Sequence, residues 1–272
     1  MTFTPELPLR TTEMVTLATC EERWRRRYLL GTHEEPSQAM GKGTLWHAVW
    51  DEWWVQEDGY RGITESNILA RIPDEKQENI TDQAWDDVRW MIRRYDQWRG
   101  GSYLATDWRV IDQEVEWEAD IGGVLFQGRV DDVRVHLPTN QVYVGECKTM
   151  IDWRRLDILE VDPQVSNYVR LAQANGYPGC VGVMYDAAKT YRWKRDEHPP
   201  SDSFRELTIL RDTPQLEAAQ VQVQIAATRR AQIATSNRAI ANISANTCMG
   251  CSFRGDCWED LAFPEEPVEW VE

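Results

Sequence analysis

Two groups of residues in this chain have the types and spacing to do chemistry. The first is a set of cysteines, with Cys20 near the beginning and Cys248, Cys251 and Cys257 near the end. Thiolates separated by short gaps can bind one soft metal centre, because irregular loops let each sulfur turn inward. The lone upstream cysteine would complete a set of four. Such a site would tie the beginning of the chain to its end.

The spacing of these cysteines leaves the metal open. Cys-x-x-Cys occurs in structural zinc sites as well as in iron–sulfur proteins, and spacing alone favours zinc. Six cysteines in 272 residues do not indicate a disulfide framework, and their clustering indicates a metal site in a reducing compartment. The other two, Cys147 and Cys180, fall in apolar strand-like segments and are expected to be core residues.

The second group is polar and contains Asp131, Glu146 and Lys148. Side chains alternate along a strand, so Glu146 and Lys148 project to the same face. An ion pair on an exposed sheet would be the ordinary explanation. However, Val142 and Val144 precede the pair and indicate a central strand, where an unpaired charge is costly. A divalent cation would compensate both carboxylates together.

Other polar residues each have an ordinary explanation when taken alone. His47 lies in a tryptophan-rich helical segment, where a single histidine is more often half-buried than a ligand. Gln164 and Tyr168 are four residues apart and share a helix face, which fits a polar helix edge. Asp132 points away from Asp131 on the strand and is expected to be solvated.

Helices are predicted for the first part of the chain and strands for the middle. Helical patterns cover residues 12–30, 43–54 and 81–99, the last opened by Thr81 and ended by Gly100–Gly101, with a polar loop and one short helix over 59–80. Strands are predicted over 108–118, 123–136, 141–149, 181–185 and 207–210, and helices over 163–175 and 214–236. This order predicts an α/β core with helical wrapping. We expect a helical region over 1–107, a core over 108–211 and a helix with cysteines over 212–272, all one structural unit.

Composition excludes several classes of protein. The net charge of −15 argues against a protein that coats nucleic acid through bulk electrostatics. It leaves room for a nucleic-acid enzyme, because local fields within about 10 Å dominate at physiological salt. No apolar run is long enough for a signal peptide or a bilayer span, so we expect a cytoplasmic protein without a membrane partner, or one in the host cytoplasm if it comes from a phage.

The order of the motifs resembles a known enzyme family. Gly43-Thr-Leu-Trp-His47, Gly128-Arg-Val-Asp131, Glu146-Cys-Lys148 and Gln164-x-x-x-Tyr168 are similar to the RecB-like branch of the PD-(D/E)XK nuclease superfamily. Cys20 and the terminal Cys-x2-Cys-x5-Cys resemble the iron–sulfur members of that branch, which include the AddB nuclease domain and CRISPR-adaptation nucleases. The segment TLATCEERWRRRYLLG is similar to their opening helix.

The resemblance implies a role for each motif residue. His47, Asp131, Glu146 and the backbone carbonyl of Cys147 would hold one Mg²⁺ or Mn²⁺. Lys148 would orient and help deprotonate the attacking water, and Gln164 and Tyr168 would contact the substrate. The implied fold is a restriction-endonuclease-like mixed sheet wrapped by N- and C-terminal helices. For the four cysteines the resemblance favours a [4Fe–4S] cluster over zinc.

A basic and aromatic run follows Cys20 and could contact a single DNA strand by phosphate pairing and base stacking. It consists of Arg23, Trp24, Arg25, Arg26, Arg27 and Tyr28. Solvated surface is the ordinary alternative. Together these features predict a metal-dependent DNA exonuclease that acts on single-stranded ends in recombination, repair or CRISPR-type adaptation, with partner proteins or an oligomer compatible with such roles. The competing hypothesis is a non-catalytic DNA-binding or scaffolding module that retains the fold.

Overall fold

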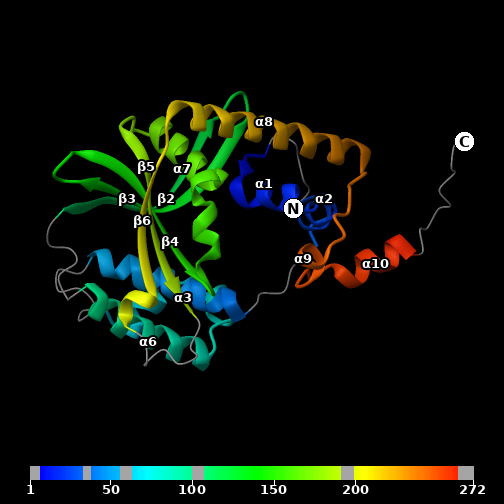
Figure 1. Cartoon of the computed structure of the whole chain (residues 1–272). Coiled ribbons are helices and arrows are strands. Elements are labelled where there is room, and N and C mark those ends of the chain that lie inside the picture. Colours follow the sequence, from blue (N-terminus) through cyan, green and yellow to red (C-terminus); the bar gives the residue numbers. More distant parts are fainter. Residues whose placement is uncertain (1–6, 33–37, 56–62, 100–106, 191–198, 263–272) are drawn as a thin grey trace, which may run out of the picture. The chain divides into compact units, whose positions relative to one another are not determined.

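The computed structural model describes residues 7–32, 38–55, 63–99, 107–190 and 199–262. The described residues form two compact units (Figure 1). The larger unit contains 36–119 and 127–219, and the smaller one contains 1–35, 120–126 and 220–272. The three consecutive regions expected from the sequence, and their union in one structural unit, stay a prediction.

A mixed sheet is the framework of the fold. Its strands are β1 (Leu9–Arg10), β2 (Trp108–Asp120), β3 (Leu125–His136), β4 (Gln141–Met150), β5 (Cys180–Lys189) and β6 (Phe204–Leu210). The order is β1-β3-β4-β5-β6, and β2 also pairs with β3. β4 runs antiparallel to β3 and parallel to β5, while β6 is antiparallel to β5. This arrangement confirms the predicted α/β class with a mixed central sheet.

Helices of the larger unit flank the sheet. They are α3 (Gln38–Val55), α4 (Glu65–Ala70), α5 (Asp74–Gln77), α6 (Asp82–Arg99), the 3-10 helix η4 (Trp153–Val161), α7 (Pro163–Ala174), the short 3-10 helix η6 (Pro200–Asp202) and the start of α8 (Thr213–Ser236). Asp162 caps α7 by accepting a 2.8 Å hydrogen bond from the Gln164 amide, and Pro163 occupies the first turn. The cap fixes where α7 begins, five residues before Tyr168.

The core of the larger unit contains many of the tryptophans. Trp46, Trp50 and Trp53 of α3 pack edge-on against Tyr95 of α6, with ring centroids 5.8, 5.5 and 4.9 Å from the tyrosine ring. All three indoles are 2% exposed. Edge-to-face aromatic pairs add about 0.5–1.5 kcal/mol each beyond the area that they bury. This packing explains why tryptophan is concentrated in the first half of the sequence.

Alternation along the strands gives the sheet two chemically different faces. The α3 face carries Cys147, Ala188 and Phe204, which join the buried cluster of α3 and α6. The α7 face carries Glu146 and Lys148, which alternate with Cys147 along β4. Cys147 and Cys180 are 0% and 1% exposed, as expected for core residues.

The α3 face also buries a charged network that corrects one sequence expectation. Asp132 is fully buried rather than solvated, and it accepts two hydrogen bonds from Arg134, at 2.5 and 2.7 Å. Arg134 donates a third to Asp186 at 2.9 Å, and the Trp50 indole donates to Asp132 at 3.3 Å. Buried charges persist when they are paired and hydrogen-bonded. A side chain at Gly145, opposite Asp132 on β4, would collide with the Asp132 carboxylate.

The smaller unit is helical. It contains α1 (Thr11–Thr19), α2 (Glu21–Trp24), one π-helical turn (Arg25–Leu29), most of α8, α9 (Ala245–Cys248) and α10 (Arg254–Ala262). The helix predicted over 12–30 is interrupted at Cys20, whose backbone is extended. Just after this break the Glu22 amide donates to the Ile240 carbonyl, so the two ends of the chain meet there.

The other predicted elements are close to the structure. The helix predicted over 81–99 is α6, and Thr81 caps it by accepting a 3.2 Å hydrogen bond from the Ala84 amide. The described part of 59–80 holds two short helices, α4 and α5, rather than one. Gly100 and Gly101, the predicted stop signal, lie outside the described residues. Among the helices described, none is long and apolar enough to cross a membrane.

Candidate active site and cysteine cavity

Four elements of the larger unit bring the predicted polar residues together. Helix α3 supplies His47, β3 supplies Asp131, β4 supplies Glu146 with Lys148, and α7 supplies Gln164 with Tyr168. His47 Nδ1 lies 3.3 Å from Asp131 Oδ1, and the Cys147 amide donates a 2.7 Å hydrogen bond to Asp131 Oδ2. The Asp131 carboxylate is therefore held by a helix on one side and by the neighbouring strand on the other.

Glu146 is at the centre of the second half of the site. Lys148 forms an ion pair with Glu146 Oε1, and Gln164 Nε2 donates to the same oxygen at 2.9 Å. Gln164 Nε2 also donates to the Tyr168 hydroxyl at 2.8 Å. These contacts join α7 to β4. All six predicted side chains thus belong to one continuous polar site.

One atom of the site lacks a partner. Glu146 Oε2 is buried and makes no hydrogen bond to any described residue. A buried carboxylate oxygen without a partner is costly, and a cation would satisfy it. Two carboxylates and an imidazole are ligands suited to Mg²⁺ or Mn²⁺. The donor set therefore fits a divalent cation, although among the described residues no three His, Cys, Asp or Glu side chains are placed to hold a metal as they stand.

The two carboxyls of the site have opposite electrostatic environments. Burial raises the pKa of Glu146 to about 7, and the charge of Asp131 acts in the same direction. Burial also acts to raise the pKa of Asp131, but His47 and Lys148 outweigh it and bring that pKa to about 2. Asp131 is thus ionised at neutral pH, while Glu146 readily takes up a proton when no cation is bound.

The basic groups respond to these carboxyls. Burial lowers the pKa of His47, but the charge of Asp131 overcomes this effect and leaves the pKa above its ordinary value. Burial acts in the same way on the pKa of Lys148, and Glu146 with Asp131 raises it well above the usual range. Burial raises the pKa of the Tyr168 hydroxyl. Lys148 therefore carries its proton in this environment, and Tyr168 stays neutral.

The glycine of the Gly128-Arg-Val-Asp131 motif has a packing role. A Cβ at position 128 would lie 2.6 Å from Leu171 Cδ1 and 3.4 Å from Tyr168 Cε1. A side chain at position 128 would force the buried Leu171 methyl of α7 to move, so glycine favours the close approach of α7 to β3. Gly128 thus helps to place Tyr168 beside Asp131.

Sequence reasoning missed one carboxyl beside the site. Asp51 follows His47 by one helical turn on α3 and is 6% exposed. Burial raises its pKa to about 7, and the charge of Asp131 adds to that effect. The four-residue spacing from His47 was the available signal, because residues i and i+4 share a helix face.

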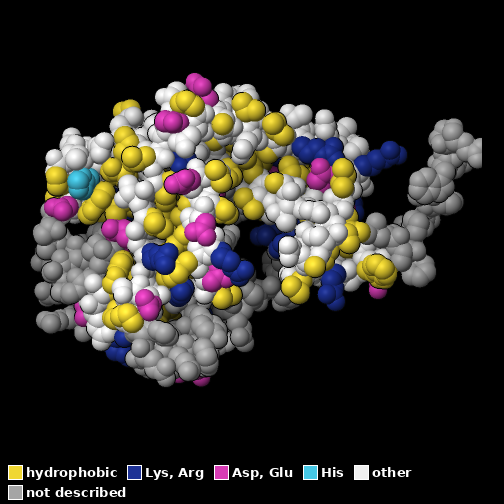
Figure 2. Space-filling model, in the orientation of Figure 1, with side chains coloured by type: hydrophobic (Ala, Val, Ile, Leu, Met, Phe, Trp, Pro, Cys, Tyr) yellow, Lys and Arg dark blue, Asp and Glu magenta, His cyan; other side chains and the backbone are white. Residues whose placement is uncertain are grey.

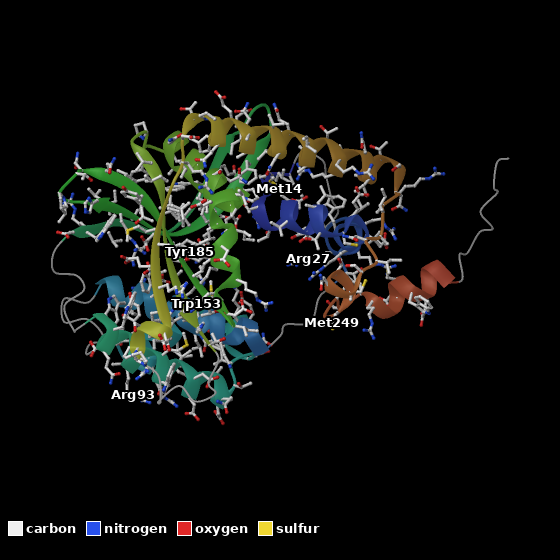
Figure 3. The ribbon with its side chains drawn as sticks, in the orientation of Figure 1. Met14, Arg27, Arg93, Trp153, Tyr185 and Met249 are labelled. Carbon is white, nitrogen blue, oxygen red and sulfur yellow. The ribbon has the colours of Figure 1, made fainter. Side chains whose placement is uncertain are left out.

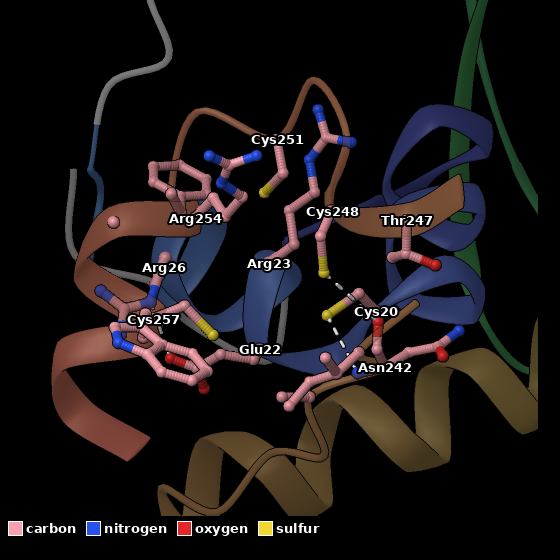
Figure 4. Close-up of a pocket in the computed structure, with 15 residues that line it drawn as sticks. Cys20, Glu22, Arg23, Arg26, Asn242, Thr247, Cys248, Cys251, Arg254 and Cys257 are labelled. Carbon is pink, nitrogen blue, oxygen red and sulfur yellow. Dashed lines mark hydrogen bonds and ion pairs between the residues drawn. The ribbon is translucent and has the colours of Figure 1, made fainter. Parts of the chain in front are cut away.

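The four predicted cysteines lie together in the smaller unit. Cys20, Cys248, Cys251 and Cys257 all line one cavity of about 470 Å³. Figure 4 shows their sulfur atoms around the same hollow. None of the four forms a disulfide. Their polar contacts are weak, since the Asn242 amide lies 3.4 Å from Cys20 Sγ and Cys248 Sγ lies 4.0 Å from the Asn242 carbonyl.

Much of the basic and aromatic run after Cys20 is engaged within the smaller unit. Trp24 is fully buried and donates a 3.0 Å hydrogen bond from its indole to Glu13, so the fold uses it for packing. Arg25 and Arg26 both form ion pairs with Glu22, at 2.8 Å.

The remaining members of the run are more accessible. Arg23 lines the cysteine cavity. Arg27 is exposed, and its guanidinium lies 5.3 Å from the centre of the half-buried Tyr28 ring. Contact of this run with DNA stays a prediction.

Comparisons with known proteins bear on the fold and on the family. No curated protein matches the sequence. The crystal structure of a "Putative exonuclease" from Eubacterium rectale aligns over 88% of this chain and 85% of that one, with 12% identity and a TM-score of 0.59. The crystal structure of SSO0001 aligns over 84% of this chain and 90% of that one, with 14% identity and a TM-score of 0.36. The first likeness shows a shared fold.

A match to a family model identifies the family of this chain. Residues 11–258 match the model of the PD-(D/E)XK nuclease superfamily. The match spans the elements that supply His47, Asp131, Glu146 and Lys148. The chain belongs to the PD-(D/E)XK nuclease superfamily.

Proposed function

We propose that this nuclease is a Mg²⁺- or Mn²⁺-dependent deoxyribonuclease that degrades single-stranded DNA from its ends. The observation that carries the proposal is the arrangement around Glu146. Two carboxylates, an imidazole and a lysine share one site, and Glu146 Oε2 is buried without a partner. Phosphodiester hydrolysis needs an activated water and neutralisation of the charge that develops on the phosphate.

The residues would divide the work as follows. His47, Asp131, Glu146 and the carbonyl of Cys147 would hold the cation, which when bound polarises the phosphate and lowers the pKa of water. Lys148, held by Glu146, would orient the attacking water and place a positive charge beside the phosphate. Gln164 and Tyr168, joined by a hydrogen bond, would contact the substrate next to the scissile bond. The hydrogen bond from Gln164 to Glu146 holds Gln164, and through it Tyr168, in position for this contact.

Action on ends is supported by charge and by similarity. A protein with a net charge of −15 cannot hold DNA over a broad surface, so it favours a strand that reaches the site through a local basic region. Arg23, Arg27 and Tyr28 are the members of the arginine run that we propose for strand contact. The description of the Eubacterium rectale protein as an exonuclease points in the same direction. Recombination, repair and CRISPR-type adaptation, with their partner proteins, are the contexts that we propose.

A digestion assay tests this function. End-labelled and circular DNA, single- and double-stranded, are incubated with Mg²⁺, Mn²⁺ or EDTA. We expect cation-dependent release of nucleotides from linear single strands, and loss of most turnover in Lys148→Ala. The matched control is Lys76→Ala, an exposed lysine on α5. Normal turnover in Lys148→Ala would contradict the assignment.

We also propose that the four cysteines bind a [4Fe–4S] cluster, with zinc as the alternative occupant. The shared cavity supports a common metal centre, because all four thiols line it and all four are free. A cluster here would be structural, since it would join α1–α2 to the segment after α8. Purified protein should be brown and contain iron and sulfide in equal amounts. Colourless protein with stoichiometric zinc would reverse the assignment.

The competing hypothesis is a non-catalytic module that binds DNA or scaffolds other proteins. A fold retained only for its shape would be free to lose Asp131, Glu146 or Lys148, and this chain keeps all three, with Asp131 beside His47 and Glu146 paired with Lys148. Binding of DNA without any cleavage under all cation conditions would favour this alternative.

A further inference from the structure

A row of basic residues extends from the nuclease site along the α7 face of the sheet. Lys148 on β4 pairs with Ala187 on β5, which pairs with Arg205 on β6. Paired residues in a sheet project to the same face, so Lys148 and Arg205 share the α7 face. Lys189 lies two residues after Ala187 and projects to that face as well. Three cations therefore occupy one face over a width of about 10 Å, the span of two strand spacings.

Trp153 joins two of these cations. It begins the 3-10 helix η4, directly after β4, and lies near the ends of the strands, below Tyr185 in Figure 3. Lys189 Nζ is 4.4 Å and the Arg205 guanidinium is 4.8 Å from the centre of the indole ring. Such cation–π contacts contribute about 0.5–2 kcal/mol each. We call Trp153, Lys189 and Arg205 the Trp153 cluster. No ion pair joins either cation to a carboxylate among the described residues, although Lys189 adds its charge to the effect of Arg154 in lowering the pKa of the nearby Asp152.

The segment that contains Trp153 also exposes apolar side chains. Ile151, Ile158 and Val161 are 73, 55 and 77% exposed, and hydrophobic side chains reach the visible surface in Figure 2. This segment, residues 151–161, connects the strand that carries Glu146 and Lys148 to the helix that carries Gln164 and Tyr168. A single strand offers unstacked bases and backbone phosphates. The exposed apolar side chains suit the bases, and the two neighbouring cations suit the phosphates.

We propose that the Trp153 cluster is the part of the protein that holds the single-stranded substrate next to the cleavage site. In this arrangement Lys189 and Arg205 bind backbone phosphates of nucleotides adjacent to the scissile one, and the exposed apolar side chains of Ile151, Ile158 and Val161 contact unstacked bases. Trp153 is a positioning residue that holds both cations toward the strand. The proposal rests on the proposed nuclease function, because the strand is located by its scissile phosphate at Lys148.

A single strand fits this surface better than a duplex. The bases of a duplex are stacked inside the helix, so the apolar side chains of 151–161 would have no partner there. In a chain with a net charge of −15, a local group of three cations defines where a polyanion can bind. The same reasoning makes binding at this group strongly dependent on salt.

Binding measured without cleavage tests the proposal. A short oligothymidylate labelled at one end is titrated with the full-length protein in EDTA at several salt concentrations, by fluorescence anisotropy. We expect Lys189→Ala combined with Arg205→Ala to weaken binding about tenfold, with the slope of log K against log salt shallower by about 0.7 for each lost phosphate contact. Trp153→Leu should weaken binding less, and Trp153→Phe should retain most of it.

The controls separate this proposal from a general effect of charge. Arg109→Ala removes an exposed arginine on β2 and should leave both affinity and salt slope unchanged. Lys189→Arg with Arg205→Lys keeps both charges and should bind like the wild type. If the double alanine variant binds like Arg109→Ala, the proposal is overturned. Equal weakening for duplex and single strand would also overturn it, because the surface would then not select single strands.

Turnover distinguishes failure of the proposal from failure of the proposed function. With Mg²⁺ or Mn²⁺ and linear single strands, the double alanine variant should raise KM with kcat nearly unchanged, because the reacting groups are intact. A wild type that cleaves, with a KM that the variant does not alter, overturns the Trp153 cluster alone. A wild type that binds the strand through these residues but never cleaves it overturns the nuclease function alone.

Discussion

The polar site and the cysteine cavity hold their functional groups in different ways. In the polar site every predicted side chain contacts another, through bonds such as Gln164 to Glu146 at 2.9 Å and Cys147 to Asp131 at 2.7 Å. In the cavity the four thiols share a volume of about 470 Å³, and the contacts of Cys20 Sγ and Cys248 Sγ with Asn242 are long, at 3.4 and 4.0 Å. The polar site is held in place by hydrogen bonds and ion pairs between protein groups. The four thiols of the cysteine cavity would instead be held in place by the metal that they bind.

This difference indicates where each site is vulnerable. A site organised by its own hydrogen bonds should keep its fold when one catalytic group is replaced, and lose only turnover. A site organised by a bound metal should lose stability when one ligand is removed, because metal binding is coupled to folding. Four sets of substitutions distinguish a site that loses only turnover from a site that loses stability.

Glu146→Gln should abolish activity without unfolding the protein. The amide cannot replace a carboxylate ligand, so turnover should fall at least about 100-fold, because the cation contributes several kcal/mol to the transition state. In EDTA the fold should be retained with only a modest change in melting temperature, because loss of the ion pair with Lys148 is offset by removal of a buried carboxyl whose pKa burial raises. Nuclease assays and thermal melts of the same samples check both parts. A large drop in melting temperature in EDTA would show that the polar site also depends on this charge for folding.

Cys20→Ala should instead lower stability. A crosslink from Cys20 to the distant Cys248 closes most of the chain into one loop, and chain-entropy models give such a closure about 5 kcal/mol. We expect loss of colour, a lower melting temperature and lower solubility, with residual turnover per folded molecule close to that of the wild type. Met249→Ala is the matched control, because Met249 is 77% exposed beside Cys248. An unchanged melting temperature in Cys20→Ala would contradict a structural role for the metal.

Arg134→Met tests whether the α3 face supports the polar site. Removing the guanidinium takes the ion pair to Arg134 away from the buried carboxylates of Asp132 and Asp186, and breaking a buried ion pair costs about 3–5 kcal/mol. The melting temperature should fall and urea unfolding should occur at lower concentration. Adding Asp132→Asn and Asp186→Asn to the same chain should recover part of the loss. No recovery would show that the guanidinium stabilises through packing on Trp50 rather than through charge.

Asp51→Asn should have the smallest effect, visible mainly as a change in pH dependence. The pKa of Asp51 is raised to about 7 from its ordinary value, so the folded protein keeps a proton that the unfolded chain has already lost. Stability therefore falls as pH rises from about 4 toward 7, and this contribution should be absent in the variant. Urea unfolding in EDTA at several pH values measures the difference. The same slope in both proteins would show that Asp51 ionises normally.

Much of the fold and of the site was accessible from the sequence. The strands around Asp131 and Glu146 follow from alternation, and the caps at Thr81 and Asp162 explain where α6 and α7 begin. The break at Cys20 was not accessible, because it depends on a hydrogen bond from Glu22 to Ile240, far along the chain. Burial of Asp132 was missed for a similar reason, since it depends on tertiary contacts: Trp50 of α3 donates to Asp132, and Asp186 of β5 shares the Arg134 guanidinium with it.

The roles of Trp24 and Asp51 show a second limit. Because Trp24 lies among arginines in the sequence, it was expected to stack on a DNA base. Its indole instead donates a hydrogen bond to Glu13 inside the smaller unit. Nothing in the sequence around Asp51 indicates a shifted pKa. The pKa of Asp51 is raised because folding buries it and brings it close to Asp131. Local pattern indicates which face a side chain takes, while its neighbours on that face are decided by tertiary packing.

Gly145 also restricts how β4 can pair with β3 during folding. Slippage of β4 by one residue against β3 would bring Val144 or Glu146 into the space that the Asp132 carboxylate fills. The same slip would turn the Glu146 carboxyl toward the α3 face, which carries the buried tryptophans. Misaligned pairing of β3 and β4 is thus opposed sterically by protein atoms alone, and libraries that randomise position 145 should return glycine.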